Sequence, residues 1–313
     1  MPSVLCHLLL ARDVLERAAR DGQHSWLCSH RDSFIAGGWG PDLGVFPGTV
    51  PLLTDCAHYI LSGQLGRKMW QVAHTDAERA FAAGWCLHIL ADAMLHPLIN
   101  ASAGEAVHGD RNQRCTWGDS PAWHQRIEIG LDGYQWVERC GDEVPRLTTQ
   151  KVIPLAERMI SAAYRECYPG CRFLDHQFST TVQNGYRGVA RLATFSIIDG
   201  HRLYGRRLPV SLWGSWLFPY GLIRLATALL GERFRFFALG QTTRPDSWLC
   251  DAYAARVDEL IPRFFNELED MFSRLPDYNL DTGDKSVESQ IDESYRGAVR
   301  AREQLAELGW AGT

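Results

Sequence analysis

The segment from Gly84 to Pro97, GWCLHILADAMLHP, constrains the fold more than any other part of the chain. Almost every residue in it is apolar or small, yet His88, Asp92 and His96 recur at four-residue intervals. Side chains four residues apart lie above one another on an α-helix, so these three form one polar stripe on an apolar helix. An apolar helix belongs in a core, where an unpaired carboxylate costs on the order of several kcal/mol. The stripe therefore predicts a buried divalent metal site with imidazole and carboxylate ligands.

The spacing of apolar residues predicts an all-α fold. The 313 residues, 46% of them hydrophobic, allow a large core. No run alternates as a strand would, and no internal repeat recurs at a fixed period. Helical spacing is present at about 4–18, 51–65, 76–96, 121–140, 148–166, 174–198, 208–230, 246–274 and 286–308.

Local signals mark where these helices begin and end. Thr75 and Glu78 form the pattern of a capping box before the central helix, and Ser120 precedes a proline suited to a first helical turn. Pro97 disfavours helix just after His96. We expect loops over 21–49, which is rich in glycine, and over 100–119, which is polar.

Charge and cysteine content argue against two classes of protein. The formal net charge is −5 with no basic block, so the chain offers no large surface for a nucleic-acid backbone. The nine cysteines are an odd number and are scattered, which argues against a disulfide framework and favours free, buried thiols.

The terminal and apolar segments bear on location. The first 22 residues have no basic lead and only a short apolar run, so we expect no signal peptide and a cytoplasmic protein. Pro219, two glycines and Arg224 interrupt the apolar stretch 208–230, so we expect a buried helical hairpin and no transmembrane span. A surface that touches lipid is the alternative, and it would make the protein peripheral to a membrane. The sequence carries no signal for an oligomeric state.

More histidines and carboxylates lie in the first half of the chain. His124 and Glu128 repeat the four-residue spacing on a second helix, and Asp132 continues their stripe. One histidine on an apolar face is usually a satisfied core residue, but two helices that each pair histidine with a carboxylate favour a metal site. The candidate ligands, in chain order, are His7, Asp42, His58, His88, Asp92, His96, His124 and Glu128. His108 is the reserve ligand, and we interpret Asp132 as a hydrogen-bonding neighbour of a ligand histidine.

This order of residues resembles the zinc-dependent phospholipase C family and the related single-strand-specific fungal nucleases. The resemblance covers about residues 1–135 and is clearest in FIAGGWGPD and GWCLHILADAMLHP. It implies a multi-helix bundle with a polynuclear metal cleft. We therefore expect a phospholipase C-like domain over 1–200 and a helical extension over 201–313 that packs on it.

The resemblance also implies which residues share each of two or three Zn²⁺ ions. One ion would be held by Asp42, His58, His88 and Asp92, and a second by His96, His124 and Glu128. His7 and Asp92 would hold the third together with the N-terminal amine. Asp92 would bridge two ions, a role that a two-oxygen ligand can fill.

A zinc cluster of this kind is suited to hydrolysis of phosphoric ester bonds. We expect a phosphodiesterase in which metal-bound hydroxide attacks phosphorus in line, with Asp42 as the residue that orients or deprotonates it. Phe46 and Tyr59 are the aromatic candidates to line the substrate's approach. The substrate would be a phosphoester, with a phospholipid as one candidate.

Three alternatives remain at this stage. One is a non-catalytic, metal-stabilised helical protein that binds a lipid or a partner. Another is a nuclease-like enzyme that acts on nucleotides. The third, which nothing in the sequence favours, is non-hydrolytic chemistry at the same pocket with iron, which histidine and carboxylate ligands permit.

Overall fold

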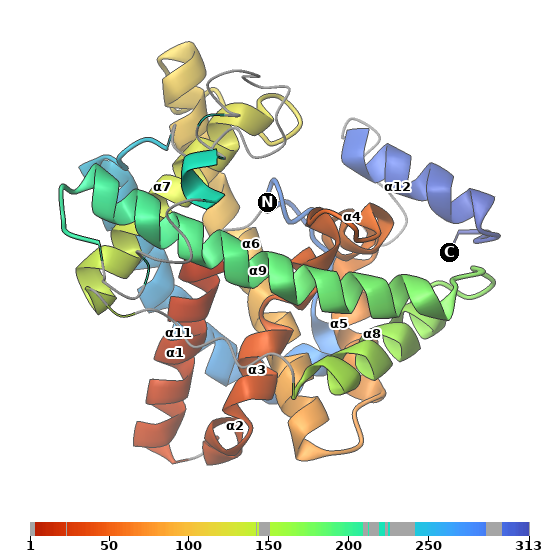
Figure 1. Ribbon diagram of the computed structural model, residues 1–313. Helices are drawn as coiled ribbons and strands as arrows, with labels where there is room; N and C mark the ends of the chain where they lie inside the picture. Colours follow the sequence, from red (N-terminus) through yellow and green to blue (C-terminus); the bar gives the residue numbers. More distant parts are fainter. Residues whose placement is uncertain are drawn as a thin grey trace. The chain divides into compact units, whose positions relative to one another are not determined.

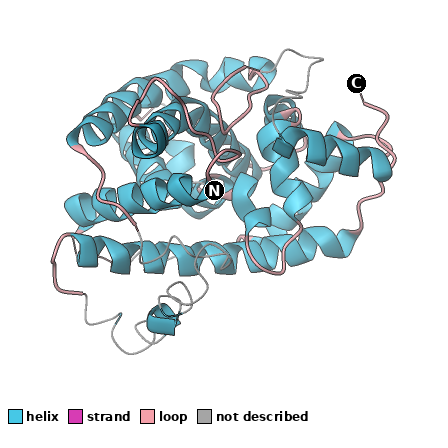
Figure 2. Ribbon diagram, turned by 90° about the horizontal axis from the view of Figure 1, so that it is seen from above, coloured by secondary structure: helices cyan, strands magenta, loops and turns pink. Residues whose placement is uncertain are grey.

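The predicted all-α class is confirmed. The computed structural model describes residues 4–22, 24–141, 143, 151–208, 212, 219–222, 225, 242–285 and 296–312. Over these residues the chain is mostly helical and contains no strand; Figure 2 shows helices joined by loops. Tyr278 and Lys285 form an isolated antiparallel bridge.

The elements follow one another as short and long helices (Figure 1). In chain order they are α1 (Val4–Asp21), α2 (Ser25–Ser29), α3 (Arg31–Gly37), the 3₁₀ helix η1 (Gly40–Val45), α4 (Pro51–Tyr59), α5 (Ser62–Gln71), α6 (Asp76–His108), α7 (Pro121–Cys140), α8 (Ile153–Cys167), α9 (Asp175–Leu203), α11 (Ser247–Arg274) and α12 (Arg296–Glu307).

The chain divides into two compact units, each built from three segments. The first unit comprises Met1–Leu9, Pro97–Leu147 and Ala190–Ala255, and the second comprises Leu10–His96, Thr148–Val189 and Arg256–Thr313. Helices α1, α6, α9 and α11 contribute residues to both. These units differ from the predicted division at residue 200, because each gathers segments that are far apart in the sequence.

The glycine-rich region 21–49 was predicted to be a loop. It instead contains α2, α3 and η1. Its glycines allow backbones to touch. A Cβ on Gly37 would lie 1.9 Å from the Phe81 carbonyl oxygen, and one on Gly84 would lie 2.0 Å from the Phe34 carbonyl oxygen. Here glycine therefore permits close packing of α3 on α6 and does not mark a turn.

The predicted end of the central helix at Pro97 is also wrong, because α6 continues to His108. Of the predicted loop 100–119, residues 109–119 are non-helical. A proline inside a helix removes one backbone hydrogen bond and costs about 3 kcal/mol. Burial opposes this cost, since Ile99, Asn100 and Ala103 are all buried. The backbone carbonyl of Asn100 also accepts a hydrogen bond from the Cys115 N–H at 3.1 Å.

Other boundaries match the sequence more closely. The capping box at the start of α6 is confirmed, since the Glu78 N–H donates to Thr75 Oγ1 and the Thr75 N–H donates to Glu78 Oε2. The helix predicted over 51–65 is two helices, because Leu61 adopts a left-handed conformation with φ of 57° between α4 and α5. Most of the predicted helix 208–230, and the first ten residues of 286–308, lie outside the described residues.

Among the described residues, α6 is the one helix long and apolar enough to cross a membrane. Its most apolar 18-residue window is 78% buried within the protein, as the core helix of a soluble protein would also be. The nine cysteines are free, five of them buried, as the sequence predicts.

Candidate metal centre

In the second unit, α6 presents His88, Asp92 and His96 as one buried stripe, with exposed fractions of 0%, 2% and 5%. Asp92 Oδ2 lies 3.1 Å from His88 Nε2, and Asp92 Oδ1 lies 4.0 Å from His96 Nε2. One carboxylate thus faces two imidazoles, one with each oxygen. The predicted stripe exists, and Asp92 is its central acid.

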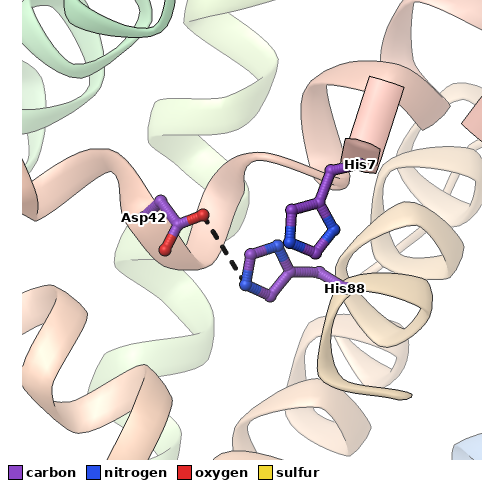
Figure 3. Close-up of side chains that lie close together, drawn as sticks. All are labelled: His7, Asp42 and His88. Carbon is purple, nitrogen blue, oxygen red and sulfur yellow. Dashed lines mark ion pairs between the residues drawn. The ribbon is translucent and has the colours of Figure 1, made fainter. Parts of the chain in front are cut away.

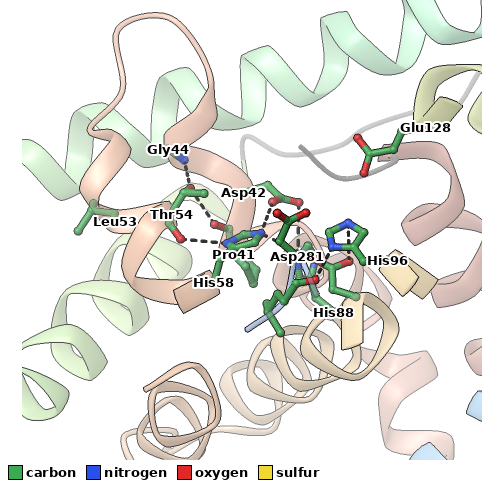
Figure 4. A network of polar contacts seen from close by, with 12 residues as sticks. Pro41, Asp42, Gly44, Leu53, Thr54, His58, His88, His96, Glu128 and Asp281 are labelled. Atoms are coloured by element: carbon green, nitrogen blue, oxygen red, sulfur yellow. Dashed lines mark hydrogen bonds and ion pairs between the residues drawn. The ribbon is translucent and has the colours of Figure 1, made fainter. Parts of the chain in front are cut away.

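Two other elements of the same unit add Asp42 and His58 (Figure 4). Asp42, on η1, lies 3.2 Å through Oδ1 from His58 Nε2 and 3.7 Å through Oδ2 from His88 Nε2. Figure 3 draws this second ion pair. His58, on α4, also lies 3.7 Å through Nε2 from Asp92 Oδ2. Two carboxylates and two imidazoles from three elements therefore meet at one point.

Each of the three histidines is oriented by a backbone carbonyl. His58 Nδ1 lies 2.9 Å from the Thr54 oxygen, His88 Nδ1 lies 2.8 Å from the Gly38 oxygen, and His96 Nδ1 bonds to the Leu280 oxygen. A carbonyl only accepts, so Nδ1 carries a proton in each ring. The Nε2 atoms face the carboxylates, which is how a ligand histidine is oriented at a metal centre.

Hydrogen bonds and close packing hold Asp42 in place. The Thr54 hydroxyl on α4 donates to the Pro41 carbonyl at 2.8 Å and accepts from the Gly44 N–H at 2.8 Å (Figure 4). A Cβ on Gly40 would lie 2.4 Å from the Trp85 ring, so η1 lies directly on α6. Asp42 is 2% exposed and lies in an ordered 3₁₀ turn, not in the flexible loop that the glycine content suggested.

The electrostatics of the centre favour a cation. Burial disfavours the charged form of His88, but the neighbouring Asp92 and Asp42 carboxylates outweigh it and raise the pKa of His88 to about 9. Without a metal, the centre therefore keeps a proton on His88 at neutral pH. A metal ion that binds at Nε2 takes the place of that proton.

The donor atoms suit a transition metal. Ligand atoms of His58, His88 and Asp92 all lie within 4.8 Å of one another, and all three residues are buried. Imidazole nitrogen with carboxylate oxygen is a donor set that zinc, iron and related ions accept. These buried groups form a set that could hold a metal ion, which is the kind of site that the sequence predicts.

The first unit holds the other predicted ligands. On α7, His124 Nε2 lies 3.1 Å from Glu128 Oε1, and both side chains are buried. The Trp117 ring meets His124 edge to face, with ring centroids 5.7 Å apart. His7, on α1, is 7% exposed. The assignment of these three residues to a second and a third ion stays a prediction.

Asp132 is engaged with the start of α1. Its two oxygens accept hydrogen bonds from the backbone N–H groups of Leu5 at 3.1 Å and Cys6 at 2.8 Å. N–H groups in the first turn of a helix have no intrahelical carbonyl to bond to, so Asp132, from α7, is placed to cap α1. The sequence pattern alone had suggested contact with a ligand histidine.

The two aromatic candidates lie in different environments. Phe46 is buried, and a Cβ on Gly188 of α9 would lie 2.2 Å from its ring. Tyr59 is half-buried beside His58, with ring centroids 5.9 Å apart. Their role in substrate binding stays a prediction.

Sequence reasoning missed the segment Leu275–Lys285. The Leu280 carbonyl is the acceptor for His96 Nδ1, and the Leu280 N–H donates to the His58 carbonyl at 3.0 Å. Asp281, the next residue, is 2% exposed. A concentration of aspartates over 277–284 was the one available signal, and nothing in the sequence linked it to residues 58 and 96.

Comparison with known proteins adds no relative: no family model, curated protein or solved structure matches the chain.

Proposed function

We propose that the chain is a zinc-dependent hydrolase of phosphodiester bonds, with chemistry like that of phospholipase C. The single observation that carries the proposal is the orientation of His58, His88 and His96. Each ring bonds through Nδ1 to a backbone carbonyl and presents Nε2 to a buried carboxylate. Three such rings around Asp42 and Asp92 fit a metal better than they fit an ordinary core.

Each residue of the centre has a proposed role in binding the metal. When bound, zinc supplies a Lewis acid that activates water at neutral pH and offsets charge on a phosphate. His58 and His88 would hold it with Asp42 and Asp92. Because Asp92 faces His88 with one oxygen and His96 with the other, it is suited to bridge two cations. The resemblance assigns the second ion to His96 with the pair on α7, and the third to His7.

Asp42 is the proposed proton acceptor as well as a ligand. Both of its oxygens face imidazoles, so its geometry supports the ligand role first. Asp42→Asn separates the two roles. If Asp42 is the base, the variant keeps most of its zinc and loses activity by about 100-fold or more. If the variant keeps both zinc and full activity, the base assignment is wrong.

The substrate class is the least constrained part of the proposal. Tyr59, half-buried beside His58, is the better placed of the two aromatic candidates to meet a substrate. A phospholipid headgroup and a nucleotide both carry the phosphodiester that the centre would cleave. The cytoplasmic location and a peripheral contact with lipid belong to the proposal and rest on the sequence.

A second candidate function is supported by burial. Asp42, His58, His88, Asp92 and His96 are all 5% exposed or less. Structural zinc sites are closed by protein ligands, whereas catalytic sites keep one position open to water. A non-catalytic helical protein that is stabilised by its metal would show this burial.

Metal content and activity measured together test both candidates. The wild type, a His88→Ala, Asp92→Ala double variant and a His176→Ala control would be analysed by elemental mass spectrometry. His176 lies exposed on α9 of the same unit. The same samples would be assayed with bis(p-nitrophenyl) phosphate and with p-nitrophenyl phosphorylcholine.

The hydrolase proposal predicts two or three zinc ions per chain and turnover of at least one diester. Both are expected to be lost in the double variant and kept in the control. Zinc that is bound and lost in the same way, without turnover of any phosphoester, would favour the structural role. A wild type that takes up no zinc would contradict both.

A further inference from the structure

The segment Leu275–Lys285, here called the 275–285 turn, is fastened to α5, the helix that follows the predicted ligand His58 in the chain. The Tyr278 N–H donates to Ser62 Oγ, which donates back to the Tyr278 carbonyl, both at 2.8 Å. The Gln64 N–H donates to Asp277 Oδ1 at 2.8 Å. The turn itself is closed by the Asn279 N–H and the Asp284 carbonyl at 2.9 Å. All of these residues belong to the second unit.

Within this turn, Leu280 contacts two predicted ligands through its backbone. Its N–H donates to the His58 carbonyl at 3.0 Å, and its carbonyl accepts from His96 Nδ1. The turn therefore lies between the end of α4 and the polar stripe of α6. It fixes the ring of His96 directly.

Asp281 follows Leu280 and is buried at this place. Its side chain is 2% exposed, the same fraction as Asp42 and Asp92. Its N–H donates to Asn279 Oδ1 at 3.1 Å, which fixes its backbone. Figure 4 draws Asp281 in the same network of polar contacts as Asp42, His58, His88 and His96.

We propose that Asp281 is a further carboxylate of the metal centre, delivered by the 275–285 turn and serving to tighten the binding of a divalent cation. The inference rests on the proposed metal-dependent function and deepens it. It assigns a role at the centre to the C-terminal third of the chain, to which the sequence resemblance assigns no ligand.

The physical reason is charge. Asp42, Asp92 and Asp281 bring three carboxylates into a water-poor space, and burial of like charges is costly without a cation. The number of carboxylates around a site is also one of the factors that set its affinity for a divalent cation. Asp281 is therefore expected to strengthen metal binding and to destabilise the protein from which the metal has been removed.

The test compares Asp281→Asn with Asp284→Asn in the full-length chain. Asp284 is exposed in the same turn, so it controls for changes to the turn itself. Chelator-stripped proteins would be titrated with Zn²⁺ in competition with a chromophoric chelator. We expect Asp281→Asn to weaken zinc binding by about 10- to 100-fold and Asp284→Asn to leave it within about twofold.

Thermal unfolding of the stripped proteins gives a second readout. Without metal, the midpoint of Asp281→Asn is expected to equal or exceed that of the wild type, because one buried charge is gone. With zinc, its midpoint is expected to lie below that of the wild type. A purely structural carboxylate would lower both.

Three results would overturn the inference. These are wild-type zinc affinity in Asp281→Asn, equal loss of affinity in both variants, and a midpoint of stripped Asp281→Asn below that of the stripped wild type. A wild type that binds no zinc is a different result, because it contradicts the proposed function before the variants are compared.

Discussion

The two helices that carry a histidine and a carboxylate four residues apart use the same spacing differently. On α6, Asp92 lies within 4.0 Å of three histidines, two from its own helix and one from α4. On α7, His124 pairs with Glu128, and the next acid in the stripe, Asp132, caps α1. A four-residue stripe thus predicts burial and pairing, while the neighbouring elements decide whether several imidazoles share one carboxylate.

The largest effect that we expect is on zinc content, and it distinguishes a substitution on α6 from one on α7. Asp92→Asn removes the carboxylate that three histidines share, and we expect the zinc content of the protein to fall to less than about a tenth of its wild-type value. Glu128→Gln is expected to remove one ion at most and to leave the ion at His58 and His88. Elemental mass spectrometry measures both variants. Complete loss of zinc in Glu128→Gln would show that the centre of the second unit does not bind metal by itself.

Gly84→Ala breaks the packing that places the α6 stripe. The new Cβ would lie 2.0 Å from the Phe34 carbonyl oxygen and 2.8 Å from Gly38 N, and the Gly38 carbonyl orients His88. We expect a loss of about 3 kcal/mol in the free energy of unfolding. Urea denaturation measures it.

Gly66→Ala on α5 is the matched control for Gly84→Ala. The three atoms nearest to the Cβ it adds would be side-chain atoms, at 3.0 to 3.2 Å, and these are able to shift. The control is expected to cost less than half as much. Equal losses in the two variants would contradict the assigned role of Gly84.

Asp132→Asn tests whether Asp132 on α7 acts as a cap of α1 and not at the metal centre. It weakens the cap on the Leu5 and Cys6 N–H groups, and we expect a loss of about 1 kcal/mol in the free energy of unfolding. Zinc bound at His58 and His88 is expected to stay unchanged. Urea denaturation and metal analysis of one preparation report both quantities. Loss of that zinc would show that Asp132 acts on the centre and not only on α1.

The smallest effect concerns the start of α6 and depends on pH. Burial alone would raise the pKa of Glu78, but hydrogen bonds from Arg158, His74 and Thr75 lower it to about 2. A carboxyl group with a lowered folded-state pKa stabilises the protein above its unfolded pKa of 4.5, and this stabilisation is lost as the pH falls through about 2.

Because Arg158 is largely exposed, we expect the contribution of Glu78 to be about 1 kcal/mol. Unfolding of Glu78→Gln followed from pH 6 to pH 2 checks it. The difference from the wild type is expected to shrink toward low pH. A difference that stays constant over this range would exclude ionised Glu78 as its source.

Much of the fold followed from local pattern. The apolar spacing predicted α1, α7, α9 and α11, and the Thr75–Glu78 pair predicted where α6 begins. Pro97 and the glycines of 21–49 gave wrong predictions of a helix end and a loop, because their effect depends on what packs against them. Gly37 allows α3 to pack closely on α6. Helix α6 continues past Pro97 because residues beyond the proline are buried.

The candidate site also has parts that the sequence predicts and parts that it does not. The α6 stripe follows from helical geometry alone, whereas the placing of Asp42 and His58 against it was suggested only by a family resemblance. Asp281 was beyond prediction, because its position depends on Leu280 bonding to His58 and His96 across more than 180 residues of sequence. Tertiary hydrogen bonds of that span leave no periodic signal in a single chain.

A crystal structure of the protein grown with zinc, with anomalous scattering measured at the zinc edge, would test directly whether His58, His88, Asp42 and Asp92 bind a metal ion. We expect a peak about 2.0 to 2.2 Å from Nε2 of His58 and of His88 and from a carboxylate oxygen of Asp42 or Asp92. Each Nδ1 would remain on its backbone carbonyl. No peak there, with Nε2 still 3.1 to 3.7 Å from the carboxylate oxygens, would contradict the proposed zinc site.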